Sequence, residues 1–409
     1  NHSLTSAASL FNHGLLSAII GWRLWLFRTW VAHLPVGQLT VTFPSQRRET
    51  FNGAGPGPDA HLDIHDMRVV NRLMSAGDLG LAESYMSGEW STPDLSALLH
   101  FGQANEQALG TTLQKTTLHR LFDRLLHARR SNTRRGSRRN IAAHYDLGND
   151  FYGHWLDPSM TYSSALFESL DEPLAPAQRR KYLRLASQLD LQPGDRVLEI
   201  GCGWGGFAEI AAGEFGCNVV ALTLSREQAA YARDRAEQGG LSNHIEVRLQ
   251  DYRDVQGKFD KIVSIEMFEA VGERYWSVYL DTLRERLAPS GKAALQIITM
   301  DDAYFEDYRL NPEFIQRYIF PGGMLPGLSL FQQAAAAASL AISDQFTFGQ
   351  SYGETLRRWD MAFQNAWPTI KTLGFDDRFY RMWRFYLCYC EVGFDTGRIN
   401  VAHFTLNHA

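Results

Sequence analysis

The sequence predicts an α/β protein, in which a doubly wound domain with a parallel sheet follows a small α+β domain. Its 409 residues suffice for two domains, and 45% apolar with 21% charged residues is ordinary for a globular chain. From about Pro176 onward, apolar strands alternate with helical patterns, which is typical of a parallel sheet with helices on both faces. Because no uninterrupted apolar stretch reaches about 18 residues, no transmembrane helix is expected.

The first domain is expected over residues 1–115. Leu15–Leu34 predicts an amphipathic helix, which either packs on its own domain, the reading we favour, or lies in a membrane interface. Leu39–Phe43 and His61–His65 alternate like strands, and a loop rich in Gly and Pro is expected between them at residues 53–58. Because the first residue is Asn, a trimmed start is expected.

A basic stripe precedes the second domain. Lys115–Arg139 contains nine basic residues and one acid, a net charge of +8, whereas the whole chain carries −5. The stripe overlaps an expected linker at residues 116–140, of which Arg129–Arg139 is rich in Ser, Gly and Arg. An acidic protein with one basic stripe is not a general nucleic-acid binder. The stripe either contacts an anionic phospholipid surface or is a solvated linker.

The second domain, over residues 141–409, is expected to alternate strands and helices. Helices are expected from about Trp204, over Glu227–Gln238 and near Tyr275–Leu287, with Ser225 and Gln228 forming a capping box. A ligand should lie at the carboxyl ends of the strands. The expected strands are Arg196–Ile200, Asn218–Thr223, His244–Leu249, Lys261–Ile265 and Ala293–Ile298.

A glycine loop follows the first of these strands. By spacing, Gly201, Gly203 and Gly206 also satisfy the dinucleotide fingerprint. Two features favour S-adenosylmethionine (SAM) instead. Glu199 at the strand end suits a cationic amino-acid group and would repel a pyrophosphate, and the next strand ends in Ala221–Ser225 without the acid that a dinucleotide ribose needs. The remaining alternative is a loop that serves only helix–strand packing.

Several ordered motifs resemble the cyclopropane-fatty-acid synthase family, which includes the mycolic-acid methyltransferases. His144–Tyr152 and Thr161–Ser163 resemble the start of that family's catalytic domain. Leu79–Trp90 is similar to a sterol-carrier-like, lipid-binding N-terminal domain of longer bacterial members. The other matching segments are the glycine loop, Leu222–Ser225 with Gln228, Met267–Glu269, Phe320–Pro326, Tyr352 and Tyr386–Cys390.

The resemblance implies a class I SAM-dependent methyltransferase that methylates an alkene carbon of an unsaturated acyl chain in membrane phospholipids. Such a site must align a weak nucleophile with the methyl donor and exclude water. Methyl transfer creates a carbocation, which aromatic faces stabilise, and a base then removes a proton. The cofactor residues implied are Tyr162, Ser163, Glu199, Gly201, Gly203, Gly205, Thr223, Leu224, Gln228, Gln250, Asp251, Tyr252 and Ile265.

In ring-forming relatives the resemblance implies that the base is a bound bicarbonate, held by a Cys, a Glu, a His, a Tyr and a second Cys. Glu269, Tyr352 and Cys390 match three of these positions, whereas Ser164 and Gln296 replace the first Cys and the His. Both replacements still form hydrogen bonds but add no charge. Cyclopropane, methyl- or methylene-branched, and furan products therefore stay open.

The other assignments are broader. His144 is expected either beside the cofactor or substrate or in a structural role. No metal is expected, because Cys388 and Cys390 lack a second pair, and four cysteines without a pattern fit a reducing, cytoplasmic compartment. We expect phospholipid acyl chains at the inner, anionic membrane face as partner, with a homodimer left open. The competing functions are a non-catalytic lipid-binding protein and a small-molecule methyltransferase.

Overall fold

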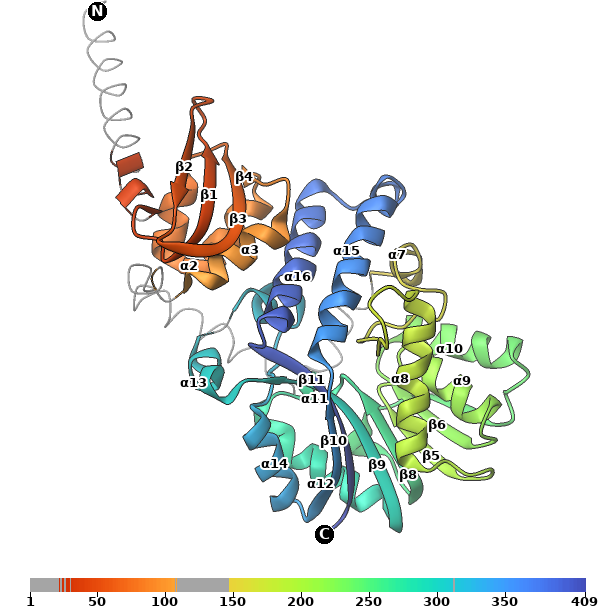
Figure 1. Ribbon diagram of the computed structural model, residues 1–409. Helices are drawn as coiled ribbons and strands as arrows, with labels where there is room; N and C mark the ends of the chain where they lie inside the picture. The colour runs from red at the N-terminus through yellow and green to blue at the C-terminus, as the bar shows by residue number, and fades with distance from the viewer. Residues whose placement is uncertain are drawn as a thin grey trace, which may run out of the picture. The chain divides into compact units, whose positions relative to one another are not determined.

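The computed structural model describes residues 22–106, 108 and 147–409, apart from 23, 26, 30 and 312 (Figure 1). The whole basic stripe, the linker and His144 lie outside the described residues. The described residues form two compact units. The first comprises those up to residue 122 together with Asp376–Val392, and the second comprises those from 123 to 375 together with Gly393–Ala409. The segment Asp376–Val392, which we expected in the second domain, thus groups with the first unit.

The first unit contains a four-stranded sheet in the order β2-β1-β3-β4. Its strands are β1 (Val36–Thr42), β2 (Arg48–Asn52), β3 (Gly55–Ile64) and β4 (Trp90–Ser91). The expected loop at 53–58 is wrong from Gly55 onward, because β3 begins there and runs parallel to β1. The start of β3 tolerates its prolines, because β4 pairs only with Asp63 and Ile64. That part of β3 therefore has one neighbouring strand and needs fewer backbone N–H donors.

Helices α2 (Arg68–Met86) and α3 (Leu95–Ala104) accompany this sheet, together with most of α16 (Asp377–Asp395). The buried Trp90 indole donates hydrogen bonds to Ser84 Oγ at 2.9 Å and to the Leu81 carbonyl at 3.1 Å. In the described part of the expected N-terminal helix, the buried Phe27 packs edge-on against Phe43, whereas Trp22 is 55% exposed. That part of the helix therefore packs on its own unit and leaves an aromatic face open.

The second unit is built on a seven-stranded sheet in the order β10-β11-β9-β8-β5-β6-β7. The expected parallel sheet with helices on both faces is confirmed for β9, β8, β5, β6 and β7, and at the other edge β11 runs antiparallel to both β9 and β10. We missed β10 because its mostly exposed, polar sequence lacks the apolar pattern of a buried strand. The strands are β5 (Arg196–Ile200), β6 (Asn218–Thr223), β7 (Ile245–Leu249), β8 (Phe259–Ile265), β9 (Leu287–Met300), β10 (Leu340–Thr347) and β11 (Ile399–His408).

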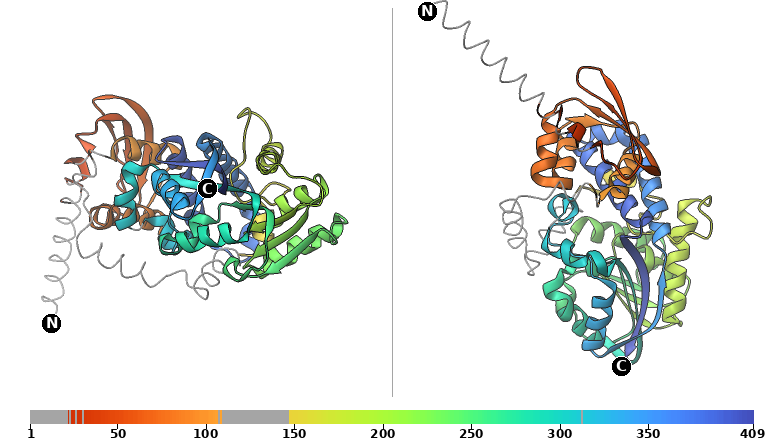
Figure 2. Two further views of the ribbon diagram at one scale, coloured as in Figure 1. Left: turned by 90° about the horizontal axis from the view of Figure 1, so that it is seen from below. Right: turned by 60° about the vertical axis from the view of Figure 1, so that its left-hand side comes forward.

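Helices lie on both faces of this sheet (Figures 1 and 2). Alternate residues of one strand enter different cores: Val197 packs with α8, α9 and α10, whereas Leu198 packs with α12 and α14. The helices are α7 (Asn149–Gly153), α8 (Leu174–Leu189), α9 (Gly206–Gly213), α10 (Arg226–Gln238), α11 (Phe268–Val271), α12 (Trp276–Arg286), α13 (Asp302–Leu310), α14 (Leu328–Ala337) and α15 (Gly349–Thr372), with short turns at Tyr252–Asp254, Glu273–Tyr275 and Ile315–Ile319.

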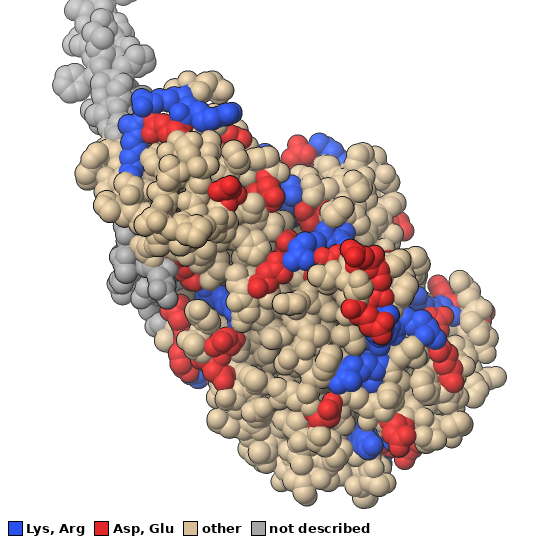
Figure 3. Space-filling model, in the orientation of Figure 1, with Lys and Arg blue, Asp and Glu red and all other residues tan. Residues whose placement is uncertain are grey.

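Within the described residues, no helix combines the length and the apolar character that a membrane crossing requires. On the face drawn in Figure 3, acidic and basic side chains are interspersed, so the described residues present no single-sign field there.

Candidate active site

The glycine loop connects β5 to α9 and brings backbone close to a pocket. The N–H groups of Gly201 and Cys202 both donate to the Leu222 carbonyl, at 3.0 and 2.8 Å, which ties the loop to the end of β6. Gly203 has φ +52°, and a Cβ built there meets no atom within 4 Å. A side chain at Gly203 would therefore project into open space, which leaves room for a ligand against the backbone.

The carboxyl ends of β5, β6, β7 and β8 surround this pocket. Of the thirteen residues that the sequence assigned to the cofactor, Gly205 is not in the lining; it begins α9 and faces Ala232. The other twelve line one pocket: Tyr162, Ser163, Glu199, Gly201, Gly203, Thr223, Leu224, Gln228, Gln250, Asp251, Tyr252 and Ile265.

Glu199 is the pocket's unsatisfied acid. Its side chain is 3% exposed, and one carboxylate oxygen has no hydrogen-bond partner among the described residues. Burial raises the pKa of Glu199 to about 8. A buried acid that lacks partners is a good site for a cationic ligand, because the cation would compensate the charge that burial disfavours.

The neighbouring polar residues are held by local contacts. Ser225 Oγ accepts the backbone N–H of Gln228 at 3.2 Å, but the Gln228 amide oxygen accepts the Thr223 hydroxyl at 2.8 Å. Only half of the expected capping box is thus observed, because the Gln228 side chain turns toward Thr223 instead of back to the helix start. Asp251 is bound by the Arg253 guanidinium at 2.6 Å, which fixes its carboxylate at the pocket wall.

A second buried polar cluster centres on Glu266, which follows β8 directly and lines the same pocket. One oxygen of its carboxylate accepts the Ser164 backbone N–H at 2.9 Å and the Gln296 amide at 2.7 Å. The other oxygen accepts the Tyr352 hydroxyl at 2.6 Å. Sequence reasoning missed Glu266, although an acid at the carboxyl end of a central strand was a signal that could have found it.

Gln296 is oriented from behind by β11. His403 Nε2 donates to Gln296 Oε1 at 2.9 Å, which directs the amide NH₂ of Gln296 toward Glu266. His403 is fully buried, and burial lowers its pKa well below the usual value. A neutral histidine with Nε2 protonated therefore fits this hydrogen bond.

Lys181 on α8 lies in the same region and is also fully buried. Its ammonium group donates to Ser163 Oγ at 2.6 Å. Burial lowers the pKa of Lys181 to about 7, while the charges of Glu266 and Asp157 oppose that shift. Burial raises the pKa of Glu266, and Tyr352, Ser164, Lys181 and Gln296 in turn favour its ionised form.

Glu269, on α11, has a different environment. One of its oxygens accepts the Ile298 backbone N–H, and the other has no partner among the described residues. Burial, with a smaller effect of the Glu266 charge, raises the pKa of Glu269 to about 8. Burial thus raises the pKa of both acids, and their donors distinguish them: three groups stabilise the anionic form of Glu266, whereas Glu269 accepts the Ile298 N–H.

The structure thus places three of the expected catalytic residues, Ser164, Gln296 and Tyr352, around one carboxylate, with Glu269 one helical turn beyond it. Cys390 is partly exposed and lies on the part of α16 that groups with the first unit, so its role stays a prediction. His144 lies outside the described residues.

Aromatic rings cover the pocket beside this cluster. Tyr162 lines the pocket, and its ring centroid lies 5.3 Å from that of Trp359 and 5.3 Å from that of Tyr152. Trp359 also contacts the Tyr352 ring edge-on at 6.3 Å. Tyr162 thus lines the pocket, while the buried rings behind it hold it in place. An aromatic ring at this wall suits a positive charge developing in a dry cavity.

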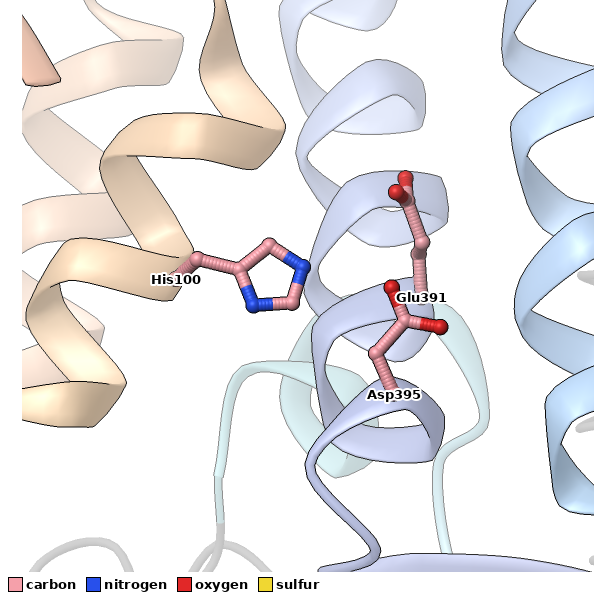
Figure 4. Close-up of side chains that lie close together, drawn as sticks. All are labelled: His100, Glu391 and Asp395. Atoms are coloured by element: carbon pink, nitrogen blue, oxygen red, sulfur yellow. The ribbon is translucent and has the colours of Figure 1, made fainter. Parts of the chain in front are cut away.

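Away from the pocket, α16 carries Glu391 and Asp395 one turn apart, and Figure 4 shows His100 of α3 facing that helix. Glu391 accepts a hydrogen bond from Ser96 Oγ at 2.7 Å, and both oxygens of Asp395 accept from Arg357 at 2.6 Å. Both carboxylates are therefore already engaged, and we assign no metal to them.

Comparisons with known proteins agree with this geometry. A family model described as mycolic acid cyclopropane synthetase matches residues 132–404. Tuberculostearic acid methyltransferase UfaA1 of Mycobacterium tuberculosis is 38% identical over 401 residues, which cover 93% of this chain and 90% of that protein. Cyclopropane-fatty-acyl-phospholipid synthase of Escherichia coli is 36% identical over 348 residues, which cover 84% and 86% of the two chains.

Among solved structures, mycolic acid cyclopropane synthase CmaA1, complexed with SAH and CTAB, superposes with a TM-score of 0.62 at 32% identity. The match covers 66% of this chain and 97% of that one. Coclaurine N-methyltransferase matches with a TM-score of 0.63 at 18% identity over 80% of this chain and 98% of that one, a likeness of fold alone.

Proposed function

We propose that this chain, which belongs to the mycolic acid cyclopropane synthetase family and is a SAM-dependent methyltransferase, methylates a double-bond carbon of an unsaturated acyl chain in a phospholipid. The observation that carries this proposal is a single pocket that combines a glycine loop, an unpartnered buried acid, an aromatic wall and a carboxylate held by three donors.

The residues at the strand ends fit SAM. Glu199, with its unpartnered oxygen, would bind the cationic amino-acid end, and Gly203 leaves space beside the backbone. Gln250, Asp251 and Tyr252 follow β7 and offer an amide, an acid and a ring to an adenosine group. When bound, SAM supplies an electrophilic methyl group. The role of each of these residues is part of the proposal.

The rest of the site suits an apolar nucleophile. An alkene reacts slowly, so the protein has to hold it in line and keep water out. Tyr162, which lines the pocket and is backed by the buried Trp359, provides an electron-rich ring for the positive charge that develops on the acyl chain. A small polar substrate would need more polar groups than this wall offers, which makes the small-molecule alternative the weaker one.

The test uses the full chain with SAM carrying a deuterated methyl group and vesicles that contain monounsaturated phosphatidylglycerol. With an unlabelled donor, transfer of one methyl carbon and loss of one proton would add about 14 mass units per acyl chain. With the deuterated donor, the deuterium that stays on the chain adds to this gain, and mass spectrometry reads the total directly. Fragmentation of the released fatty acids then distinguishes a ring from a methyl or methylene branch.

Gly203→Asp provides the matched inactive variant, because its side chain would enter the pocket next to Glu199. Gly240→Asp is its control: Gly240 also has a positive φ (+68°) with open space around a Cβ, but it is exposed and does not line the pocket. We expect the parent and G240D to label lipid and G203D to be inactive. If the parent binds SAM but labels no lipid, a non-catalytic lipid-binding protein becomes the better reading.

A further inference from the structure

Hydrogen bonds hold the Glu266 carboxylate in a fixed position within the site. Donors from three separate parts of the unit converge on it: the Ser164 N–H from the loop after α7, the Gln296 amide from β9 and the Tyr352 hydroxyl from α15. The buried Lys181 amine favours the ionised form of this carboxylate when it is protonated, and the carboxylate itself lines the ligand pocket. An acid with a purely structural role would not need so many hydrogen-bond donors to its carboxylate.

From this arrangement we propose that the Glu266 carboxylate is the proton acceptor of the methylation reaction and stands where a separate bound anion would otherwise be needed. The inference rests on the proposed function, because it concerns the second half of that reaction. The inference goes beyond the proposed function because it names a residue of the chain as the base, and no sequence motif assigned that role to Glu266.

The residues present do not fit an additional bicarbonate. Ser164, Gln296 and Tyr352 occupy positions where the family resemblance placed bicarbonate ligands. The side chains of Gln296 and Tyr352 already donate to Glu266, as does the backbone N–H of Ser164, whose hydroxyl donates to the Ala165 carbonyl. A second anion at this point would lie beside the Glu266 charge and would have to take its donors away. Like charges so close together cannot both be ionised without a large cost.

The chemical step then balances without a further reactant. After methyl transfer the acyl chain carries a positive charge on carbon. One alkene carbon then bears the new methyl group, and its neighbour carries the charge. If a C–H bond of the methyl group breaks, its electron pair bonds to the cationic carbon and closes a ring, and the proton moves to a Glu266 oxygen. If a hydride first shifts from the methyl-bearing carbon to the cationic carbon, the charge moves to the methyl-bearing carbon, and loss of a methyl proton to Glu266 leaves a methylene branch; loss of a proton from an adjacent chain carbon leaves a methyl-branched alkene. Glu266 returns the proton to solvent when product leaves.

The backbone indicates that Glu266 is held at this place for its carboxylate. Its φ of +49° lies in the left-handed region, which costs about 1 kcal/mol for a residue with a Cβ and which glycine adopts freely. Glu266→Gly therefore removes the carboxylate and relieves the backbone at once, so this variant should fold. It also opens a space surrounded by three donors.

The experiment measures turnover of E266G in buffer depleted of carbon dioxide and then with added bicarbonate, formate or acetate. We expect a loss of about 10²–10⁴-fold, the usual value of a general base, with SAM affinity unchanged by calorimetry. Added anion should raise the turnover rate of E266G at least tenfold. E266Q, which fills the same space with an amide, should lose activity without rescue, and the parent should not respond to bicarbonate.

A matched control is S339G, because Ser339 also has a positive φ (+58°) but is exposed and does not line the pocket. The inference is overturned if folded E266G stays within about threefold of the parent rate, if no anion rescues it, or if bicarbonate accelerates the parent. A parent that methylates no lipid at all would instead refute the proposed function.

Discussion

Replacing Tyr352 by Phe would isolate one hydrogen bond to the proposed base. The Tyr352 hydroxyl donates to Glu266 at 2.6 Å, while its ring stacks on Phe394 with centroids 4.3 Å apart. Phenylalanine keeps this ring packing and removes only the donor. Because the hydrogen bond favours ionised Glu266, its loss must raise the pKa of Glu266 further above the ordinary carboxyl value.

The magnitude follows from the charge of the acceptor. A hydrogen bond to a charged group is worth about 1.5–3 kcal/mol, and one pKa unit corresponds to about 1.4 kcal/mol. Tyr352→Phe should therefore raise the pKa of Glu266 by about 1–2 units. A base acts only when ionised, so activity is present above this pKa and is lost as the pH falls through it. The acidic limb of the rate profile should move upward by the same 1–2 units.

The assay is single-turnover methylation at saturating SAM between about pH 5.5 and 9.5. The other charged groups around Glu266, Lys181 on α8 and Glu269 on α11, are the same in both proteins, so their titration does not create a difference. Tyr304→Phe is the control, because Tyr304 is 40% exposed and lies outside the pocket lining. An acidic limb that Y352F leaves in place, or moves downward, would refute the assignment of Glu266.

Three further predictions concern the cofactor, stability and the membrane. G203D should weaken SAM binding by at least about 100-fold in calorimetry, whereas G240D should not, because only the first position faces the pocket. Without ligand, Glu199 keeps a proton up to about pH 8 in the folded state but only to about its ordinary 4.5 when unfolded, so stability should fall by at most about 1.4 kcal/mol per pH unit across that window. Glu199→Gln should flatten this fall in urea unfolding, and an unchanged slope would contradict the assigned burial effect. Binding to anionic vesicles should weaken at high salt. Sedimentation should also show weaker binding after Gln replaces four residues of the basic stripe, Arg134, Arg135, Arg138 and Arg139; equal sedimentation would mean that the stripe is only a linker.

The central strands could be predicted because their signals are local. Arg196–Ile200 and Asn218–Thr223 are short apolar runs between turns, and the structure has strands with the same bounds. Two of the edge strands, β2 and β10, could not be found in this way. β2 and β10 are polar and mostly exposed, so only their pairing with β1 and β11 makes them strands. That pairing depends on tertiary contacts that no local pattern contains.

The pocket lining was also accessible from the sequence. In a parallel sheet, the carboxyl ends of neighbouring strands meet at one edge, so residues after β5, β6 and β7 had to lie together. Gly205 shows the limit of this reasoning. The family resemblance implied a ligand contact at Gly205, but the turn directs a Cβ there toward Ala232 on α10.

The two neighbouring acids after β8 show why the base could not be chosen from the sequence. Glu269 belongs to the recognised motif, and Glu266 stands three residues before it without one. Their roles depend on donors that lie 102, 30 and 86 residues away from Glu266 along the chain, namely Ser164, Gln296 and Tyr352. Glu269 accepts the backbone N–H of Ile298 and has one oxygen without a partner among the described residues, so fewer donors stabilise its anionic form. A carboxyl group becomes a base or a neutral acid according to the donors that folding brings to it, and here folding brings them to the residue outside the motif.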